Sequence, residues 1–591
     1  MKTFISKYIK KSGLCIAMVL PLTCGFIACS DEHMTEVNTD DSKSAVINPN
    51  SLLTTGLLQT YGDFNLMDTY RSYITGFTQH FAGGWNVTNY AGSVNYKDDQ
   101  SALLWNRYYT VAIKHLVQGI YKTQDRPVLN AMLRIHRVYI LDIITDTYGD
   151  VPCTEAGLGY LERKSTPKYD KQEAIYEFFF KELEECVKQL DEEDLKVTGD
   201  VTSLGGSAKA WQRYANSLRM RLAMRISNVK PELAKEEFEK AYNDSHGFIA
   251  TKDENAYVKY TNNNFTLYDG ARDFDFRVNA LGEILYGQDA ESPTFICSTF
   301  FNIMNDSNDP RLYRICRHYL NTKRNNVQPD RVENHDLTDD VVEYLKSTNT
   351  SEAPCNPGAA WYNNWISAPG KDALPALAKF DASYTGNNYD ARMMRPALNI
   401  DFEMPETPGI LITSAEVNFL LAEAKTKGWN VAKTAEEYYD QGVRESMEML
   451  NDYYLNKDYD KLITEDEINA FIAANKLSAT NPKETINTQA WILHMMNPSE
   501  GWANMRRSDY PAILNRDLLT KNGFTYTDPD WSMPVRLQYP ELEAQYNNAN
   551  YKAAIDRMGG TDDWHKRLWW DKADVNLQPD FNPPFGKGYS K

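Results

Sequence analysis

The fold is decided by a stretch that reads SAKAWQRYANSLRMRLAMRISN from Ser207 to Asn228. Its apolar residues recur at helical spacing, which predicts an amphipathic helix. The buried face of that helix would comprise Trp211, Ala215, Leu218, Leu222 and Ile226. Its arginines are interpreted as a solvated or salt-bridged flank rather than a binding patch; they are Arg213, Arg219, Arg221 and Arg225.

Three more helices are predicted upstream of this stretch. Residues 101–121 have helical spacing, and Pro127 stands in the first turn of the next helix, where its missing N–H is not needed. That helix ends in the turn DTYGDVP (residues 146–152), which contains Gly149. Asp170 and Glu173 have capping-box spacing before a third helix. The apolar faces contain Leu129, Met132, Leu133, His136, Ile140 and Ile143, then Ile175, Phe179, Leu183, Cys186 and Leu190. We interpret His136 as a satisfied core residue rather than a ligand.

Helices are also predicted downstream. Pro231 opens a helix over residues 232–242, and two more cover residues 414–427 and 432–451, joined by the turn Gly428-Trp429-Asn430. Small residues at the expected crossings, such as Ala422 and Ala435, suggest antiparallel pairs of the tetratricopeptide kind, in a degenerate form.

Residues 247–408 differ from both flanks. They are rich in Asn, Asp, Pro and Gly and have no sustained helical period. A segment this long is not one loop, so we predict an irregular lobe with short helices and few strands. No linker of Pro, Gly and Ser divides the body. Residues 51–591 are therefore expected to form one domain, with a helical scaffold over about 51–246 and 409–591.

The N-terminus has the pattern of an export signal. Four lysines precede the apolar run GLCIAMVLPLTCGFIA, which is shorter than a membrane span and ends at Ala28. Phe26-Ile27-Ala28-Cys29 resembles a bacterial lipobox, and Cys24 is the weaker alternative. Residues 1–28 are thus a predicted lipoprotein signal peptide, Cys29 the lipidated residue, and residues 29–50 a tether. Ser30-Asp31-Glu32 resembles the surface-export tag of Bacteroidota lipoproteins, which predicts an outer-membrane protein that faces the cell exterior.

The composition of the chain restricts the classes of ligand and partner that we expect. The net charge of −18 argues against a nucleic-acid partner, which requires clustered basic residues. Aromatic residues make up 12% of the chain, and such side chains suit flat, amphipathic ligands such as sugars. The cysteines beyond Cys29 are scattered, with no metal spacing. Calcium is conceivable at the acidic turn Asp306-Ser-Asn-Asp309, but its spacing is not that of an EF-hand, and no metal or other cofactor is predicted.

An ordered series of motifs resembles the SusD/RagB family, in particular its SusD-like branch. The motifs are DTYGDVP (146–152), WQRYANSLRMRLAMR (211–225), AEVNFLLAEA (415–424), AEEYYDQGVR (435–444), QAW (489–491), EGWANMRR (500–507), PVRLQYP (534–540) and LWWD (568–571). Together, and in this order after a lipobox, these motifs are specific for the family.

The resemblance implies a mainly α fold of tetratricopeptide-like helix pairs with an irregular lobe. It also implies a partner, a SusC-like TonB-dependent β-barrel of the outer membrane, which the lipoprotein caps as a hinged lid. The ligand would be an oligosaccharide, or a peptide in some members, and it would not be chemically changed. Charged residues within the motifs are interpreted as buried ion pairs rather than ligand contacts; they are Asp150, Glu416, Glu423, Arg506 and Arg507.

Two loop segments combine aromatic rings with amides, the mixture that oligosaccharide recognition requires. The first follows Gly83-Gly84 and supplies Trp85, Asn86, Tyr90 and Tyr96. The second lies in the irregular lobe and supplies Trp361, Tyr362 and Trp365. These seven are the candidate ligand-binding residues. Each ring could instead pack under its own loop or face the barrel partner.

Two other classes of protein remain as alternatives. A surface glycoside hydrolase would need two carboxylates across the scissile bond, and with 81 acidic residues the sequence always permits such a pair. Nothing marks one, however, because HExxH, GxSxG and P-loop patterns are absent, so no catalytic residue is predicted. The other alternative is a scaffold whose helix pairs bind only proteins.

Overall fold

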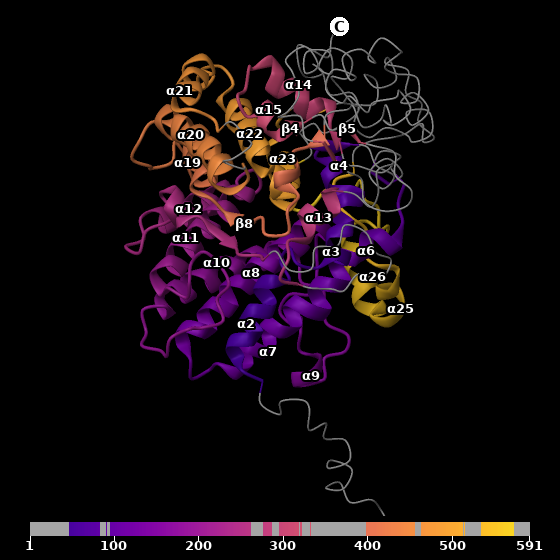
Figure 1. Ribbon diagram of the computed structural model, residues 1–591. Helices are drawn as coiled ribbons and strands as arrows, with labels where there is room; N and C mark the ends of the chain where they lie inside the picture. The colour runs from indigo at the N-terminus through magenta and orange to yellow at the C-terminus, as the bar shows by residue number, and fades with distance from the viewer. Residues whose placement is uncertain are drawn as a thin grey trace, which may run out of the picture. The chain divides into compact units, whose positions relative to one another are not determined.

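The computed structural model describes residues 47–82, 90–91, 95–261, 276–286, 295–317, 320–321, 331–332, 397–455, 462–511, 513 and 534–572 (Figure 1). The chain divides into two units, Met1–Ile47 and Asn48–Lys591. The following description concerns the second unit. The predicted signal peptide, Cys29 and nearly all of the tether lie outside the described residues.

The N-terminal helices pack around one long, buried helix. Its neighbours in the chain are α2 (Pro49–Leu58), α3 (Phe64–Thr69), α4 (Thr75–Phe77), α6 (Asp98–Arg107) and α7 (Lys114–Lys122). The long helix itself is α8 (Pro127–Tyr148), which begins at the proline that predicted its start. The helix predicted over residues 101–121 is real but contains a π-helical stretch, Tyr108–Ile113, and a second π-helical stretch, Tyr70–Ile74, follows α3.

Helices α9 (Gly159–Glu162), α10 (Gln172–Gln189), α11 (Ala208–Arg225) and α12 (Pro231–Tyr242) follow. In Figure 1, α8, α10, α11 and α12 lie in succession, and each contacts the next. The predicted capping box at Asp170 is wrong. The Asp170 carboxylate accepts hydrogen bonds from the N–H groups of Cys153 and Thr154, and Asp150 accepts one from the N–H of Gln172 at 2.8 Å.

The C-terminal helices are α19 (Ser414–Thr426), α20 (Ala435–Tyr453), α21 (Glu465–Ala474), α22 (Pro482–Leu493) and α23 (Pro498–Ser508), then α25 (Glu541–Tyr546) and α26 (Asn548–Arg557). The predicted helix pair over residues 414–427 and 432–451 is present as α19 and α20, which pack against each other. The helices α19 and α20 approach closely at Gly442. A Cβ at this position would lie 2.7 Å from the Phe419 ring, so only glycine permits the crossing.

Short elements carry the described part of the irregular lobe. Four strands form an antiparallel sheet in the order β1-β3-β7-β4, and β2 pairs with β8, as β5 does with β6. The strands are β1 (Phe81–Ala82), β2 (Ala256–Val258), β3 (Phe295–Ile296), β4 (Cys316–Arg317), β5 (Leu320–Asn321), β6 (Arg331–Val332), β7 (Ala397–Leu398) and β8 (Gly409–Ile412). The short helices are α13 (Ala280–Tyr286), α14 (Ser298–Asp306) and α15 (Leu312–Ile315), with 3-10 turns Lys252–Glu254, Ile400–Phe402 and His494–Met496. The mainly α prediction, with few strands, is confirmed.

The predicted core residues lie inside. His136 is fully buried, and its Nε2 lies 3.0 Å from the carbonyl oxygen of Gly56 and 3.1 Å from Oγ1 of Thr60. Cys186 and Cys316 are buried thiols, as predicted. No helix in the described ranges is both long and apolar enough to cross a bilayer.

Candidate functional site

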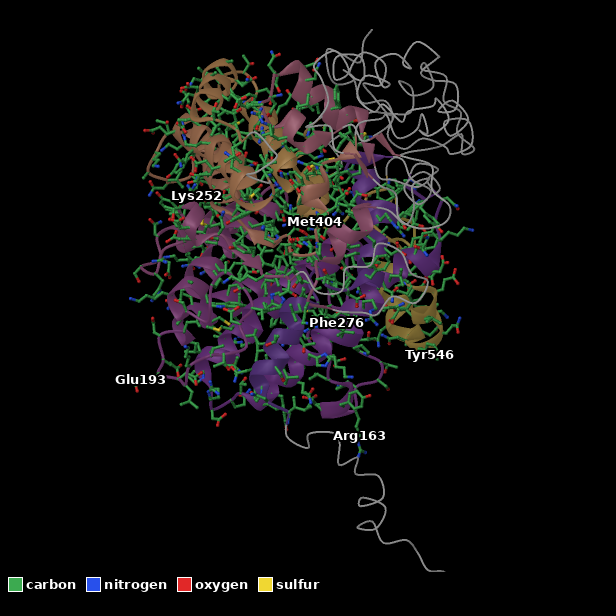
Figure 2. All side chains as sticks on the ribbon, viewed as in Figure 1. Arg163, Glu193, Lys252, Phe276, Met404 and Tyr546 are labelled. Atoms are coloured by element: carbon green, nitrogen blue, oxygen red, sulfur yellow. The ribbon has the colours of Figure 1, made fainter. Side chains whose placement is uncertain are left out.

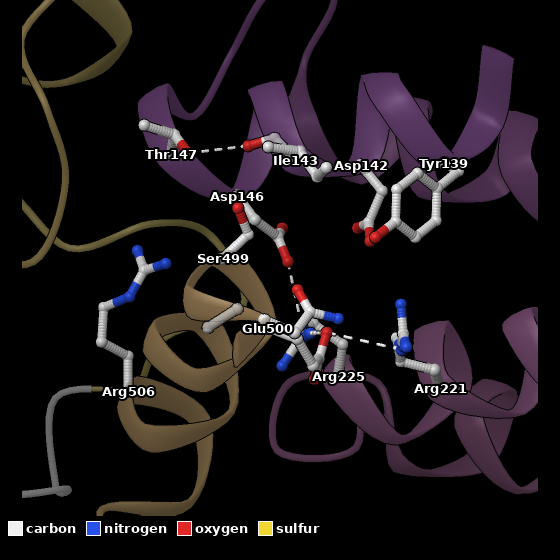
Figure 3. Close-up of a pocket in the computed structure, with 12 residues that line it drawn as sticks. Tyr139, Asp142, Ile143, Asp146, Thr147, Arg221, Arg225, Ser499, Glu500 and Arg506 are labelled. Carbon is white, nitrogen blue, oxygen red and sulfur yellow. Dashed lines mark hydrogen bonds and ion pairs between the residues drawn. The ribbon is translucent and has the colours of Figure 1, made fainter. Parts of the chain in front are cut away.

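Buried charges join the N-terminal and C-terminal helices (Figure 3). Arg225 on α11 lies 2.9 Å from Asp146 on α8 and also pairs with Glu500 on α23. Arg221, one turn earlier, contacts Glu416 on α19 at 2.6 Å. All five side chains are less than a tenth exposed. The arginines of α11 thus form salt bridges, which was one of the two predicted alternatives. Arg221 and Arg225, however, lie in the interior rather than on a solvent-exposed flank.

We name this set the buried charge network and include in it Asp142, Asp146, Arg221, Arg225, Glu416, Glu500 and Arg506. Burial, and then the charge of Asp146, raise the pKa of Asp142 well above its ordinary value. The cavity between the residues of the network has a free volume of about 10 Å³, which at most admits one water molecule. The network is therefore structural, not a ligand pocket.

The other charged residues of the motifs are also structural, although one of them, Arg506, departs from its predicted role. Glu423 on α19 accepts two hydrogen bonds of 2.7 Å from Arg507 on α23, and both are buried. Asp150 pairs with Arg557 at a partly exposed position. Arg506 does not form the predicted ion pair with any described residue. It donates to the carbonyl oxygens of Trp502 and Val535, and its guanidinium lies 3.8 Å from the Trp502 ring centroid.

One cluster in the network has the residue types of a metal site. Glu416, His494 and Glu500 each offer one ligand atom, and these atoms lie within 4.8 Å of one another. Arg221 already engages both carboxylates, at 2.6 Å and 3.5 Å, so a cation would have to displace a guanidinium. We assign these carboxylates to ion pairs. At the acidic turn considered for calcium, the Asp309 carboxylate likewise pairs with Arg311.

Two of the seven candidate ligand residues, Tyr90 and Tyr96, are described, and both belong to one aromatic cluster. The Tyr90 ring centroid lies 5.7 Å from that of Tyr73, and the Tyr96 ring stands edge-on to Trp564 at 5.6 Å. Tyr73 and Trp564 contact each other at 6.1 Å and are buried, whereas Tyr90 and Tyr96 are half-buried. The outer rings thus rest on an inner aromatic layer and keep part of their surface exposed.

Hydrogen bonds hold this aromatic cluster (Tyr73, Tyr90, Tyr96 and Trp564) in place. The Tyr73 hydroxyl donates to the carbonyl oxygen of Asn95 at 3.0 Å and accepts from the N–H of Lys97 at 2.8 Å. The Tyr96 hydroxyl donates to Asp98, which also accepts from the N–H of Glu541 at the start of α25. Burial raises the pKa of Tyr73, Tyr90 and Tyr96, so their hydroxyls stay protonated at physiological pH. The cluster offers ring faces and neutral hydroxyls, which suit the C–H faces and hydroxyls of sugars.

Five of the seven candidates, Trp85, Asn86, Trp361, Tyr362 and Trp365, lie outside the described residues and stay predictions. Sequence reasoning missed the inner layer. Tyr73 lies in a π-helical stretch and Trp564 in a C-terminal turn, more than 490 positions along the chain. No local pattern connects two residues at that separation.

Two family models match the sequence. One, described as "Starch-binding associating with outer membrane", covers residues 41–357, and the other, described as "Susd and RagB outer membrane lipoprotein", covers residues 378–571. None of the curated proteins matches the chain.

Solved structures resemble the fold over most of its length. A Bacteroidetes SusD-like protein is 36% identical, with a TM-score of 0.77 over 89% of this chain and 100% of the other. A chitin-binding protein is 29% identical, with a TM-score of 0.68 over the same shares. A SusD homologue from Bacteroides uniformis is 22% identical, with a TM-score of 0.63 over 89% of this chain and 100% of the other. At this identity the likeness supports the fold alone. Family models match both halves of the sequence, and solved SusD-like structures match the fold. The chain therefore belongs to the SusD/RagB family of outer-membrane lipoproteins.

Proposed function

We propose that this protein is a non-catalytic lipoprotein of the outer cell surface that binds an oligosaccharide and delivers it to a transporter. The single observation that carries the proposal is the match of both family models, one of which is described as starch-binding. The 29% identical structure of a chitin-binding protein supports a glycan as the ligand class. The half-buried rings of Tyr90 and Tyr96 supply the surface chemistry that a glycan needs.

The transporter would be a SusC-like TonB-dependent barrel, which the protein would cover as a hinged lid. Lipidation of Cys29 would anchor the chain to the outer membrane, and Ser30-Asp31-Glu32 would direct it to the outer face. The support is the family's description as outer-membrane lipoproteins together with the lipobox-like sequence.

Ligand binding can be tested by titration calorimetry with oligosaccharides derived from starch and from chitin. Trp85→Ala, Trp361→Ala and Tyr90→Ala should each weaken binding by about tenfold, which corresponds to loss of about 1.4 kcal/mol. Tyr160→Ala is the matched control, because Tyr160 is 86% exposed and belongs to a different surface on α9. Unchanged affinity in all three variants would refute this assignment of the site.

Partner binding can be tested by affinity purification of the intact lipoprotein from detergent-solubilised outer membranes. Recovery of a large TonB-dependent barrel supports the lid, whereas recovery of other proteins alone favours the scaffold alternative. Cys29→Ser, which removes the acceptor sulfur, should abolish incorporation of labelled palmitate. Equal labelling of this variant would contradict the anchor.

Two alternatives predict different products or ligands. A peptide-binding member of the family would respond to a peptide array and not to glycans. A glycoside hydrolase would release reducing ends from candidate polysaccharides on prolonged incubation. Retarded migration of the protein in polysaccharide gels without new reducing ends supports the binding function.

A further inference from the structure

A second place on the molecule has the geometry of a small ligand site. A cavity of about 280 Å³ lies where α8 ends, α10 begins and the segment after α26 returns. This volume is near the lower end of the range for small-molecule pockets. The cavity shares no residue with the aromatic cluster, and its lining includes Lys171, Lys566 and Trp569. We name it the basic pocket.

Backbone and side-chain contacts fix the walls of the basic pocket. Helix α8 ends at Tyr148 and is followed by the cap residue Gly149, whose φ of 96° is a conformation that glycine adopts readily. The Gln172 amide then holds α10 to two other elements. It donates to the carbonyl oxygen of Thr145 at 2.8 Å and accepts from the backbone N–H of Trp569 at 3.0 Å. The aromatic wall is therefore positioned before any ligand arrives.

The charges of the basic pocket do not cancel. Five basic and two acidic side chains line it. Three of the basic side chains are arginines that pair with aspartates, namely Arg557 with Asp150, Arg536 with Asp562 and Arg567 with Asp571, and Glu173 pairs with Lys230. Lys171 and Lys566 form no ion pair with any residue in the described part of the chain. The lining thus combines two ammonium groups that lack an ion-pair partner among the described residues with the half-buried Trp569.

We infer that the basic pocket binds a sugar ring that carries a negative group, such as the carboxylate of a uronic acid or a sulfate ester. The ring packs against Trp569, and Lys171 and Lys566 attract the anion. This site is separate from the aromatic cluster, so it stands whether or not that cluster binds the main ligand.

The test is titration of the protein with trigalacturonate, with its fully methyl-esterified form as the neutral probe. Wild-type protein should bind the acid at least tenfold more tightly than the ester, and added salt should weaken binding of the acid. Lys566→Glu should weaken binding of the acid by at least tenfold. Lys209→Glu is the matched control, because it makes the same change of charge at an exposed position on α11 and should leave affinity unchanged. Circular dichroism confirms that each variant is folded.

Two more variants distinguish a sugar site from general attraction of anions and from binding at the aromatic cluster. Trp569→Leu should weaken binding of trigalacturonate but not of inorganic sulfate, which has no ring to stack. Trp85→Ala should leave trigalacturonate binding intact, even where it abolishes binding of neutral glycans. Equal affinity for acid and ester, an unaffected Lys566→Glu variant, or equal loss of sulfate binding in Trp569→Leu would each overturn the inference.

Discussion

The buried charge network and the aromatic cluster both join parts of the chain that lie far apart in sequence, but they use opposite chemistry. The network pairs Arg221 with Glu416, 195 positions away, and excludes solvent. The cluster joins Tyr96 to Trp564 and leaves part of its tyrosine surface exposed (Figure 2 shows side chains across the described part of the chain). All residues of the network except Asp142 belong to the motifs that mark the family, whereas Tyr90 and Tyr96 lie outside them. The motif residues of the network therefore serve the scaffold, whereas the proposed ligand residues Tyr90 and Tyr96 are found between motifs.

Breaking the network should have the largest effect. Arg225→Met would leave Asp146 and Glu500 buried without their cation, and we expect the free energy of unfolding to fall by roughly 3 to 5 kcal/mol. Equilibrium urea unfolding measures this. Arg213→Met is the control on the same helix. Its side chain is 38% exposed, so loss of its pair with Glu254 should cost less than about 1 kcal/mol. Equal effects of the two substitutions would remove the distinction between interior and flank.

The next largest effect concerns how the free energy of unfolding of the buried interior changes at acid pH. Burial lowers the pKa of His136 to about 4, below the value of about 6.5 in the unfolded chain. The stability that neutral His136 contributes is therefore fully present above pH 6.5 and is lost as the pH falls toward 4. Buried Asp142 acts in the opposite sense, because its pKa is raised. The informative quantity is thus the difference in unfolding free energy between wild type and His136→Asn.

That difference should shrink by roughly 2 to 3 kcal/mol between pH 7.5 and 4.5, because any packing defect of His136→Asn is the same at every pH. His246 provides a control of opposite sign. Burial opposes its protonation, but the hydrogen bond with Asp244 and the charge of Asp191 outweigh burial and raise its pKa. His246→Asn should therefore cost most at acid pH and least as the pH rises through the folded-state pKa. A parallel response of the two variants would contradict this account.

Local signals in the sequence were sufficient for most helices and insufficient for the sites. Pro127 and Pro231 predicted two helix starts correctly, because the constraint on proline acts within one turn. Asp170 failed as a cap because Asp150, 22 positions from Gln172, takes that role through a tertiary contact. Arg506 failed as an ion pair because the Trp502 ring and two backbone carbonyls satisfy it. Partners that only the folded chain brings together cannot be inferred from spacing.

The smallest expected effect concerns one hydroxyl of the aromatic cluster. Tyr96→Phe keeps the ring against Trp564 but removes the hydrogen bond of 3.2 Å to Asp98. Because Asp98 still accepts from the N–H of Glu541, we expect a loss of only about 0.5 to 1 kcal/mol in unfolding free energy. Oligosaccharide affinity should fall by no more than about threefold, whereas Tyr96→Ala, which removes the ring, should lower it by about tenfold. Calorimetric titration of both variants separates the two contributions, and equal losses would show that the hydroxyl, rather than the ring face, makes the contact with the sugar.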